Sequence, residues 1–486
     1  MICTRLLFVA LAPLAGLAPT SLDAQAARPV GALGAAPADT LRLAVEDAVA
    51  RMLATSDEAR LANAQVALAD AAITSARSAG LPQLRLNSSY QQVLKNARAE
   101  IVGSVFGQSY TYNASLQLEQ SIFEGGRVVA ASQAASRIGR AATMSRAETR
   151  AQLAVDAQRV YLSALFTARI ADIQRRNLAL ADERLAQVQQ LEQAGRTSRY
   201  DVLRARVERA NLEPLALQAE SDRVLAELEL KRLLDIPVEQ PVMLTTALDP
   251  VRVGEMAEAA AANGSPAGIR PSVRAAELTA RARAAGVRVA RADLMPSISA
   301  SFNLGYLALP SSPGFPSRLG ETSASLCPPG SDPGRVCQNN GWFPNRNFGI
   351  SMSWPIFDGL LTKGRIDLAQ AQQRIADIEL RRAREQAAID VAGARAELAR
   401  AQAAFAARST NVSEAEEAFE LATLRFERGI GTQLEVSDAQ FALLNARSTE
   451  ARATFDLYLA VAELARVRAE PIPLPNGGTA ATGGTP

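Results

Sequence analysis

The sequence predicts an α+β membrane protein in which antiparallel strands cross a bilayer and continue into helical hairpins roughly 100 Å long. Three observations lead to this fold class. The chain is a tandem duplication, each copy changes from helical to alternating periodicity and back, and two stretches of nearly seventy residues contain no proline. Such long uninterrupted helices exceed the range of ordinary globular helices and are typical of coiled-coil walls or stalks.

The composition excludes several classes of function. Among 486 residues, 52 Lys plus Arg face 50 Asp plus Glu, so the basic excess expected of a nucleic-acid binder is missing, and no nucleic-acid partner is predicted. The chain has no histidine, which removes imidazole-based nucleophile activation and most zinc sites. We therefore predict no enzymatic activity, no catalytic residues, no cofactor and no metal site.

The N-terminus has the pattern of an export signal. A basic Arg5 precedes the apolar run from Leu6 to Leu17, and Ala24-Gln25-Ala26 supplies the small residues that signal peptidase requires. The run is too short to span a bilayer, and Cys3 is poorly placed for lipid attachment. We expect a signal peptide at 1–26 and a flexible N-terminus at 27–40.

Two pairs of matching positions define the duplication. Pro82 and Pro296 lie 214 positions apart, whereas Ile122 and Ile356 lie 234 apart, so the second copy carries a 20-residue insertion between its two markers. Each copy forms one structural unit. The expected units are a first repeat at 41–237, a linker at 238–267, a second repeat at 268–471 and a disordered tail at 472–486.

Each repeat begins with helical periodicity, as from Leu41 to Ala79, and then changes to strand periodicity. Apolar and polar residues alternate in four segments of about ten residues, around 84–94, 110–119, 298–306 and 348–354. A half-buried soluble sheet would alternate in the same way. Strand length and the Tyr or Trp near strand ends favour a membrane, and because open edges are intolerable in lipid, several chains must combine their strands. These aromatic residues are Tyr90, Tyr110, Tyr306 and Trp354.

A long helix follows each strand pair, from Gly125 to Glu192 and from Gly359 to Arg428. Each ends at a glycine turn, after which a second helix returns and ends near Pro237 or Pro471. Ser198 and Thr432 are suited to cap the returning helices, with Asp201 and Glu435 three residues later as the capping-box acids.

Two cysteines, Cys327 and Cys337, lie in the inserted segment of the second repeat, which is rich in Pro, Gly and Asn. In an exported protein, two thiols ten positions apart in one loop predict a disulfide. Metal binding by the pair is the alternative, and the absence of histidine counts against it.

The order and spacing of these features resemble the TolC-type outer-membrane channel family, over residues 41–470. The most specific segments are the strand-to-helix junctions Ile122 to Gly125 and Ile356 to Gly359, the tip Phe426 to Val436, and the start of the second unit, Arg270 to Glu277. The resemblance implies a homotrimer whose twelve strands form an outer-membrane β-barrel, continued by a helical barrel across the periplasm. It also implies outer-membrane lipid, a periplasmic adapter and an inner-membrane transporter as partners.

The function implied is an exit duct that passively exports small molecules delivered by the transporter and the adapter. An exit duct for type I protein secretion has the same architecture and stays open as an alternative. A different class, a non-conducting periplasmic coiled-coil stalk anchored by a barrel, predicts helices without polar faces toward a lumen, whereas the strands here have clean polar faces.

The resemblance assigns two groups of residues at the hairpin tips. Glu435 and Asp438, one turn apart, match family acids that ring the periplasmic mouth, where carboxylates favour cations. Phe426 and Gly431 stand where the family has a closing hydroxyl and arginine, so the closing device differs. Two alternatives are left open: Asp201 pairs with Arg428 or Arg199, or an apolar constriction closes the mouth. The turns form the expected adapter-docking surface: Gly195, Arg196, Thr197, Ser198, Gly429, Ile430, Gly431 and Thr432.

Overall fold

The computed structural model describes residues 40–95, 110–262, 268–310, 314–316, 319, 341–475 and 479. The predicted signal peptide at 1–26, the flexible segment as far as residue 39, and both Cys327 and Cys337 lie outside these residues. The signal, the flexible segment and the disulfide therefore stay predictions.

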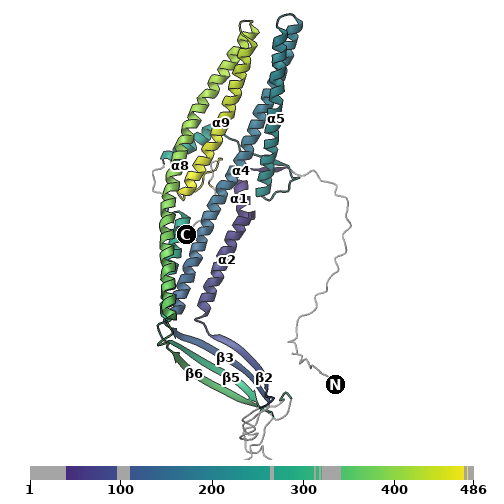
Figure 1. Ribbon diagram of the computed structural model, residues 1–486. Coiled ribbons are helices and arrows are strands. Elements are labelled where there is room, and N and C mark those ends of the chain that lie inside the picture. Colours follow the sequence, from purple (N-terminus) through teal and green to yellow (C-terminus); the bar gives the residue numbers. More distant parts are fainter. Residues whose placement is uncertain are drawn as a thin grey trace, which may run out of the picture.

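The described chain is elongated, with a four-stranded sheet at one end and two helical hairpin tips at the other (Figure 1). The first half contains β1 Leu41–Leu43, α1 Val45–Thr55, α2 Asp57–Ser78, β2 Gln83–Gln92, β3 Tyr110–Glu124, α4 Arg127–Gln193 and α5 Arg199–Leu233. The second contains β4 Val242–Leu244, α6 Pro250–Ala262, α7 Pro271–Ala292, β5 Ser297–Ala308, β6 Trp342–Ser353, α8 Leu361–Glu427 and α9 Gln433–Val467. Among the described residues, no helix is both long enough and apolar enough to cross a membrane.

The helix expected from Leu41 to Ala79 is wrong in detail, because this segment forms β1, α1 and α2 in succession. The break falls at Ser56, whose extended backbone ends α1 and whose hydroxyl accepts a hydrogen bond from the Ala59 amide at 3.2 Å. The linker region also contains regular structure, since β4 pairs in parallel with β1 and α6 packs on α9. Both pairings join segments far apart in sequence, and local periodicity cannot predict such contacts.

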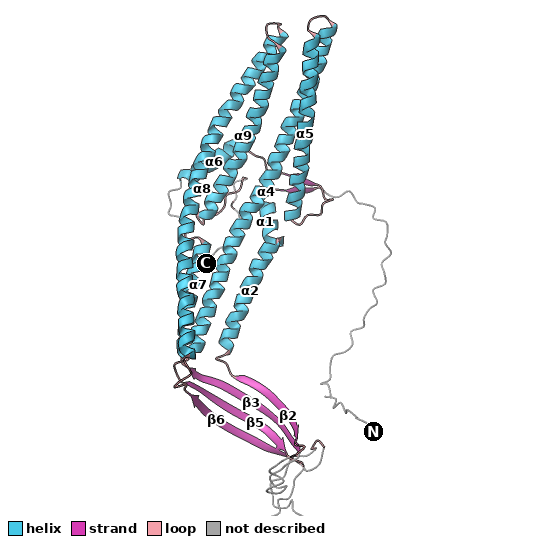
Figure 2. Cartoon of the chain, in the orientation of Figure 1, coloured by secondary structure: helices cyan, strands magenta, loops and turns pink. Residues whose placement is uncertain are grey.

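The four longer strands form one antiparallel sheet in the order β2-β3-β5-β6, as Figure 2 shows below the helices. Within a row of the sheet, Leu86 faces Leu116 and Leu116 faces Leu304, so each repeat contributes one hairpin to a common apolar face. A bulge between Ser121 and Phe123 interrupts the register where β3 approaches its helix. Within the described chain, β2 and β6 are the two edges of this sheet.

The main core lies near the middle of the molecule, where α1, α4, α5 and α9 meet the short strands. The Tyr161 hydroxyl is fully buried there, donating to the Leu43 carbonyl at 2.7 Å and accepting from the Thr246 amide at 3.1 Å. Ile472 and Leu474 pack into the same core. The prediction of disorder from residue 472 is therefore wrong for these two positions, because two apolar side chains beyond the last helix find a buried site there.

Candidate channel sheet and hairpin tips

The sheet has one face suited to lipid. On β6, Phe348, Ile350 and Met352 are 68%, 64% and 66% exposed, and they project from the same face. Twelve residue steps separate Trp342 from Trp354. At about 3.3 Å per residue and a tilt near 40°, this is roughly 30 Å along the membrane normal, close to the ~25 Å apolar band of outer-membrane barrels.

Aromatic side chains mark the end of the sheet away from the helices. The rings of Tyr90 and Tyr112 contact each other in a tilted arrangement with centroids 4.9 Å apart, and the Trp342 ring lies 6.3 Å from that of Tyr112. The Trp342 indole donates a hydrogen bond to the Pro316 carbonyl at 2.8 Å. Such rings, apolar in body and polar at one end, suit the interface between lipid and water.

The opposite face of the sheet is polar. The Ser299 and Ser351 hydroxyls lie 2.9 Å apart, and the Asn87 amide donates to the Gln117 side-chain carbonyl at 3.5 Å. Asn303 continues this face beside Gln117. A sheet with one apolar and one polar face fits the wall of a water-filled barrel in lipid.

The first hairpin tip joins α4 to α5 and is held by a capping box. Gly195 takes a left-handed conformation with φ 69°, which other residues rarely adopt. The Asp201 carboxylate accepts hydrogen bonds from the Ser198 hydroxyl at 2.6 Å, the Thr197 hydroxyl at 2.9 Å and the Ser198 amide at 3.1 Å. The Ser198 hydroxyl lowers the pKa of Asp201, and this outweighs burial, which acts in the opposite direction. These bonds within its own turn hold the carboxylate in the single chain, and no ion pair of Asp201 with Arg428 or Arg199 is seen among the described residues, so that pairing stays a prediction.

The second tip joins α8 to α9 and has a weaker cap. Gly429 has φ 77°, and the Glu435 amide donates to the Thr432 hydroxyl at 3.3 Å. The Glu435 carboxylate lies 3.6 Å from the Arg425 guanidinium and is 44% exposed. Asp438 is also exposed and lies one turn further along α9. Both predicted mouth acids are thus open to water near the tip.

Phe426, at the end of α8, contacts the other hairpin. The Arg184 guanidinium of α4 lies 5.1 Å from its ring centroid, a cation–π arrangement between the two hairpins. Burial lowers the pKa of Arg184, while the charges of Glu208 and Glu427 act to raise it. The sequence alone did not indicate this contact, because its two residues lie more than two hundred positions apart.

A groove of about 660 Å³ lies between α5 and α9, just behind the tips. Its apolar lining includes Tyr200, Leu203 and Phe441, which are 69%, 47% and 68% exposed, and Asp438 lies on its wall. The Ser437 hydroxyl donates to the Glu208 carboxylate at 2.6 Å across the groove. The sequence alone did not indicate this groove, because its lining residues come from both repeats.

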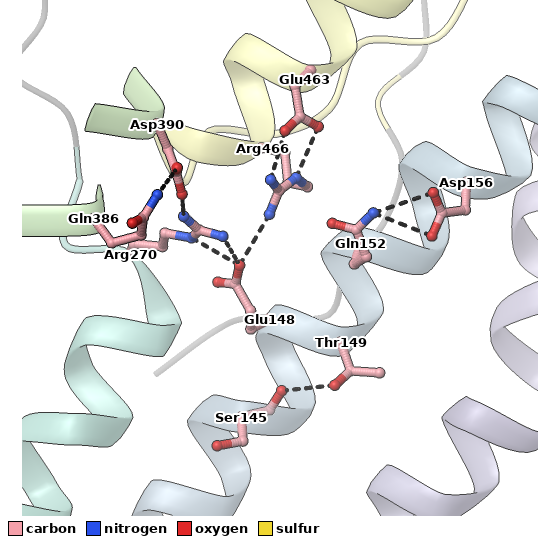
Figure 3. Close-up of polar contacts among 10 residues, drawn as sticks. All are labelled: Ser145, Glu148, Thr149, Gln152, Asp156, Arg270, Gln386, Asp390, Glu463 and Arg466. Atoms are coloured by element: carbon pink, nitrogen blue, oxygen red, sulfur yellow. Dashed lines mark hydrogen bonds and ion pairs between the residues drawn. The ribbon is translucent and has the colours of Figure 1, made fainter. Parts of the chain in front are cut away.

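A second group that the sequence did not reveal is a charged network in the middle of the helices (Figure 3). Arg270 contacts Glu148 of α4 at 2.7 Å and Asp390 of α8 at 2.5 Å, and Arg466 of α9 contacts Glu148 at 3.1 Å. The Arg270 side chain is only 14% exposed. Burial acts to lower the pKa of Arg270, but Glu148 and Asp390 raise it overall. The network therefore fixes three long helices to the start of α7.

Within the described residues, no group of three or more acidic or thiol side chains is placed to hold a metal ion. The geometry instead defines a class of protein: an outer-membrane duct whose strands cross the lipid and whose helices extend into the periplasm. The chain belongs to the outer membrane efflux protein family, whose model matches residues 48–235 and 268–469. No match is found among curated protein sequences.

Solved outer-membrane channels share the fold. The outer membrane protein VceC of Vibrio cholerae is 20% identical with a TM-score of 0.67, covering 88% of this chain and 96% of its own. The CmeC outer membrane channel of Campylobacter jejuni is 15% identical with a TM-score of 0.67, covering 87% and 85%. The open state of the MtrE outer membrane channel of Neisseria gonorrhoeae is 20% identical with a TM-score of 0.66, covering 88% and 89%. The resemblance to the TolC-type family and the α+β membrane fold are thereby confirmed.

Proposed function

We propose that three copies of this chain form the exit duct of a tripartite efflux system, through which small molecules pass passively out of the cell. The observation that carries the proposal is the two-faced sheet, whose edge strands β2 and β6 each have a free side among the described residues. Four strands per chain cannot close a barrel, and lipid does not tolerate open edges. Two copies would give eight strands, whose interior side chains fill, whereas three give twelve and leave a lumen.

The helices continue the duct on the periplasmic side. Both α4 and α8 contain 67 residues, or roughly 100 Å at 1.5 Å per residue, and lead directly away from the sheet. Their tips are the parts of the described chain farthest from the sheet (Figure 1). An inner-membrane transporter and a periplasmic adapter complete the proposed system, and the adapter docks on the turns Gly195 to Ser198 and Gly429 to Thr432.

The mouth of the duct is proposed to select by charge. Glu435 and Asp438 are exposed near the second tip, so three copies place six carboxylates around one opening. Rings of carboxylates favour cations over anions in narrow pores. Because Phe426 is engaged with Arg184, the proposed closing device includes an aromatic–cation contact between hairpins.

The test is single-channel conductance of the purified mature protein in a planar lipid bilayer, with its native mass measured in detergent. A trimer with a small, cation-selective conductance is expected. Replacing Glu435 and Asp438 together by Ala should raise conductance and reduce block by divalent cations. The matched control, Asp57→Ala with Glu58→Ala, removes the same charge at the start of α2, away from the tips, and should change neither value.

Three outcomes would contradict all or part of the proposal. A trimer that inserts in the bilayer and never conducts, with or without the alanine substitutions, would favour a stalk. If conductance and cation block are unchanged in the Glu435 and Asp438 variant, the proposed charged mouth is contradicted, but the proposed duct is not. Secretion of a folded or unfolded polypeptide, with no effect on small-molecule export, would favour the protein-secretion alternative.

A further inference from the structure

We propose that the lipid-facing side of the sheet binds a phosphorylated, acylated glycolipid of the outer leaflet, with Arg346 on the phosphate and an aromatic platform beside the sugar. The aromatic platform consists of Tyr90, Tyr112, Phe315 and Trp342. The inference rests on the outer-membrane location of the chain, and it does not depend on export through the proposed duct.

Arg346 projects from the apolar face of the sheet. Side chains alternate between the two faces of a strand, so Arg346 of β6 shares its face with Phe348 and Trp342. In the register of the sheet, Arg346 lies opposite Leu304 of β5, which in turn lies opposite Leu116 of β3. The exposed arginine side chain therefore starts from a row of leucines, and not from the polar face.

No other charged residue of β2, β3, β5 or β6 lies on this face. The three other charges of these strands belong to the polar face, and each has a partner there. Arg85 lies 3.9 Å from Glu119, and Glu124 lies 2.6 Å from Arg127 at the start of α4. For the Arg346 side chain, the described part of the chain contains no hydrogen bond or ion pair.

The charge of Arg346 thus calls for an anion from outside the chain. An arginine in contact with lipid is costly unless its charge is paired or reaches the interface. Because the apolar face of these strands carries no carboxylate, the same face of a second copy supplies no partner either. The missing partner therefore has to come from the lipid.

The depth of Arg346 suits a lipid headgroup. Trp342, at the end of the sheet away from the helices, lies four residues from Arg346, or about 10 Å along the membrane normal at a tilt of about 40°. The row between them contains Tyr306 and Ser88, the first polar side chains that follow on this face. Arginine side chains extend along apolar surface until the guanidinium reaches the interface. The charge therefore lies where acyl chains meet headgroups, in the leaflet away from the periplasm.

The aromatic platform lies just outside this boundary. The Phe315 ring centroid is 5.3 Å from that of Trp342 and 5.7 Å from that of Tyr112. Phe315 is 76% exposed and Tyr90 is 53% exposed, so much of the platform is uncovered in the described chain. Large rings with polar atoms at their edges suit a headgroup that presents both C–H groups and hydroxyls, as a sugar ring does.

A phosphorylated glycolipid fits all three features of this surface. Its phosphate has the charge opposite to that of Arg346, and it can accept two hydrogen bonds from one guanidinium group. Its acyl chains lie along the apolar rows of Leu304 and Phe348, and its sugar lies beside the platform. A glycerophospholipid supplies the phosphate and the chains, but it has no sugar ring for the platform.

A simpler role for Arg346 is protection of an edge strand. Pro344 and Arg346 lie on β6, an edge of the sheet in the described chain, and prolines and charges on edge strands discourage wrong pairing. That role predicts that Arg346→Gln aggregates more than the parent but binds the lipid equally well. Such a result would overturn the proposed site.

Native mass spectrometry of the full mature protein in detergent, titrated with diphosphoryl lipid A, tests the proposal. Arg346→Gln should bind this lipid about tenfold more weakly than the parent, and Arg346→Lys should recover much of the loss. The matched control, Arg85→Gln, removes the same charge from the polar face of the same sheet, where the side chain is 63% exposed, and should bind like the parent.

A second variant and two further lipids make the test independent of how Arg346→Gln folds. Phe315→Ala lies outside the strands and should weaken lipid A binding about threefold. Lipid A without its phosphates should bind the parent about tenfold more weakly than the diphosphoryl form, and equal binding would overturn the phosphate contact. Phosphatidylglycerol that binds as tightly as lipid A would overturn the assignment to a glycolipid. The proposed duct is tested separately, by conductance.

Discussion

The two repeats share a local side-chain contact but use it differently. Gln152 of α4 donates to the Asp156 carboxylate at 3.2 Å, and Gln386 of α8 donates to the Asp390 carboxylate at 2.7 Å, 234 positions later. Both pairs are visible in Figure 3. Only Asp390 also receives Arg270, at 2.5 Å. The duplication thus preserved a contact within one helix turn, whereas the contact between helices belongs to the second copy alone.

This difference between the repeats arises at the residue just before α7 in the second repeat and just before α2 in the first. Arg270 precedes α7, and the matching position before α2 is Ser56, which is too short to reach another helix. Glu148, the other partner of Arg270, matches Arg382 in the second repeat. The contact between the two repeats therefore contains a largely buried ionic network beside its apolar packing, and it depends on an arginine that the first repeat lacks at the matching position.

Removing Arg270 is expected to cause the largest loss of stability. Arg270→Ala leaves two partly buried carboxylates without their main partner, so we expect a loss of about 3 to 5 kcal/mol in the free energy of unfolding. Arg232→Ala is the matched control, because Arg232 pairs with Glu229 as Arg466 pairs with Glu463, but at 67% exposure. The control should lose no more than about 1 kcal/mol. Denaturant unfolding followed by circular dichroism measures both, and equal losses would contradict a special role for the network.

The C-terminal segment offers a second comparison between the repeats. Ile472 is fully buried, whereas Val238, its counterpart 234 positions earlier, is 63% exposed. We expect Ile472→Ala to cost about 2 to 4 kcal/mol through lost burial and a cavity, and Val238→Ala to change stability by less than about 0.5 kcal/mol. Thermal unfolding of both variants in detergent checks this. Similar midpoints for the two would show that the C-terminal segment does not hold the core together.

These comparisons also explain what the sequence could predict. The four strands and two 67-residue helices were predictable because alternation and the absence of proline are local signals. The capping residues Ser198 and Thr432 were predictable for the same reason, since a cap acts on amides within three residues.

The other features depend on which helix and strand faces pack together in three dimensions. The burial of Ile472 follows from a core assembled by four helices, and no pattern near a Pro-rich terminus reports it. The Arg270 network and the groove beside Tyr200 join residues from both repeats. Asp201 was predictable as the capping-box acid, because its bonds to Ser198 and Thr197 lie within one turn.

The network predicts a difference in acid stability. Burial acts to raise the pKa of Asp390, but hydrogen bonds from Gln386 and Arg270, with the charge of Arg270, lower it overall. A carboxyl group whose pKa is lowered on folding stabilises the protein above its unfolded pKa of about 3.9, and this stability is lost as the pH falls through the folded value. We expect Asp390→Asn to be less stable than the parent at neutral pH and to lose less stability between about pH 5 and pH 2. In an Arg270→Ala background the same substitution should have little further effect, and a full effect there would rule out the proposed partner.

The smallest expected difference is between the two tips. Asp201 accepts three hydrogen bonds from its turn, whereas Glu435 accepts one, from the Thr432 hydroxyl at 3.3 Å. Ser198→Ala should therefore destabilise the first tip by about 1 kcal/mol, and Thr432→Ala the second by about 0.5 kcal/mol. Amide hydrogen exchange in the first turns of α5 and α9 measures each tip separately, so the effect can be detected even if the stability of the whole protein does not change. A larger effect at the second tip would mean that the weaker cap is the one on which its hairpin depends, and the ion pair of Glu435 with Arg425 would then be the contact to remove next.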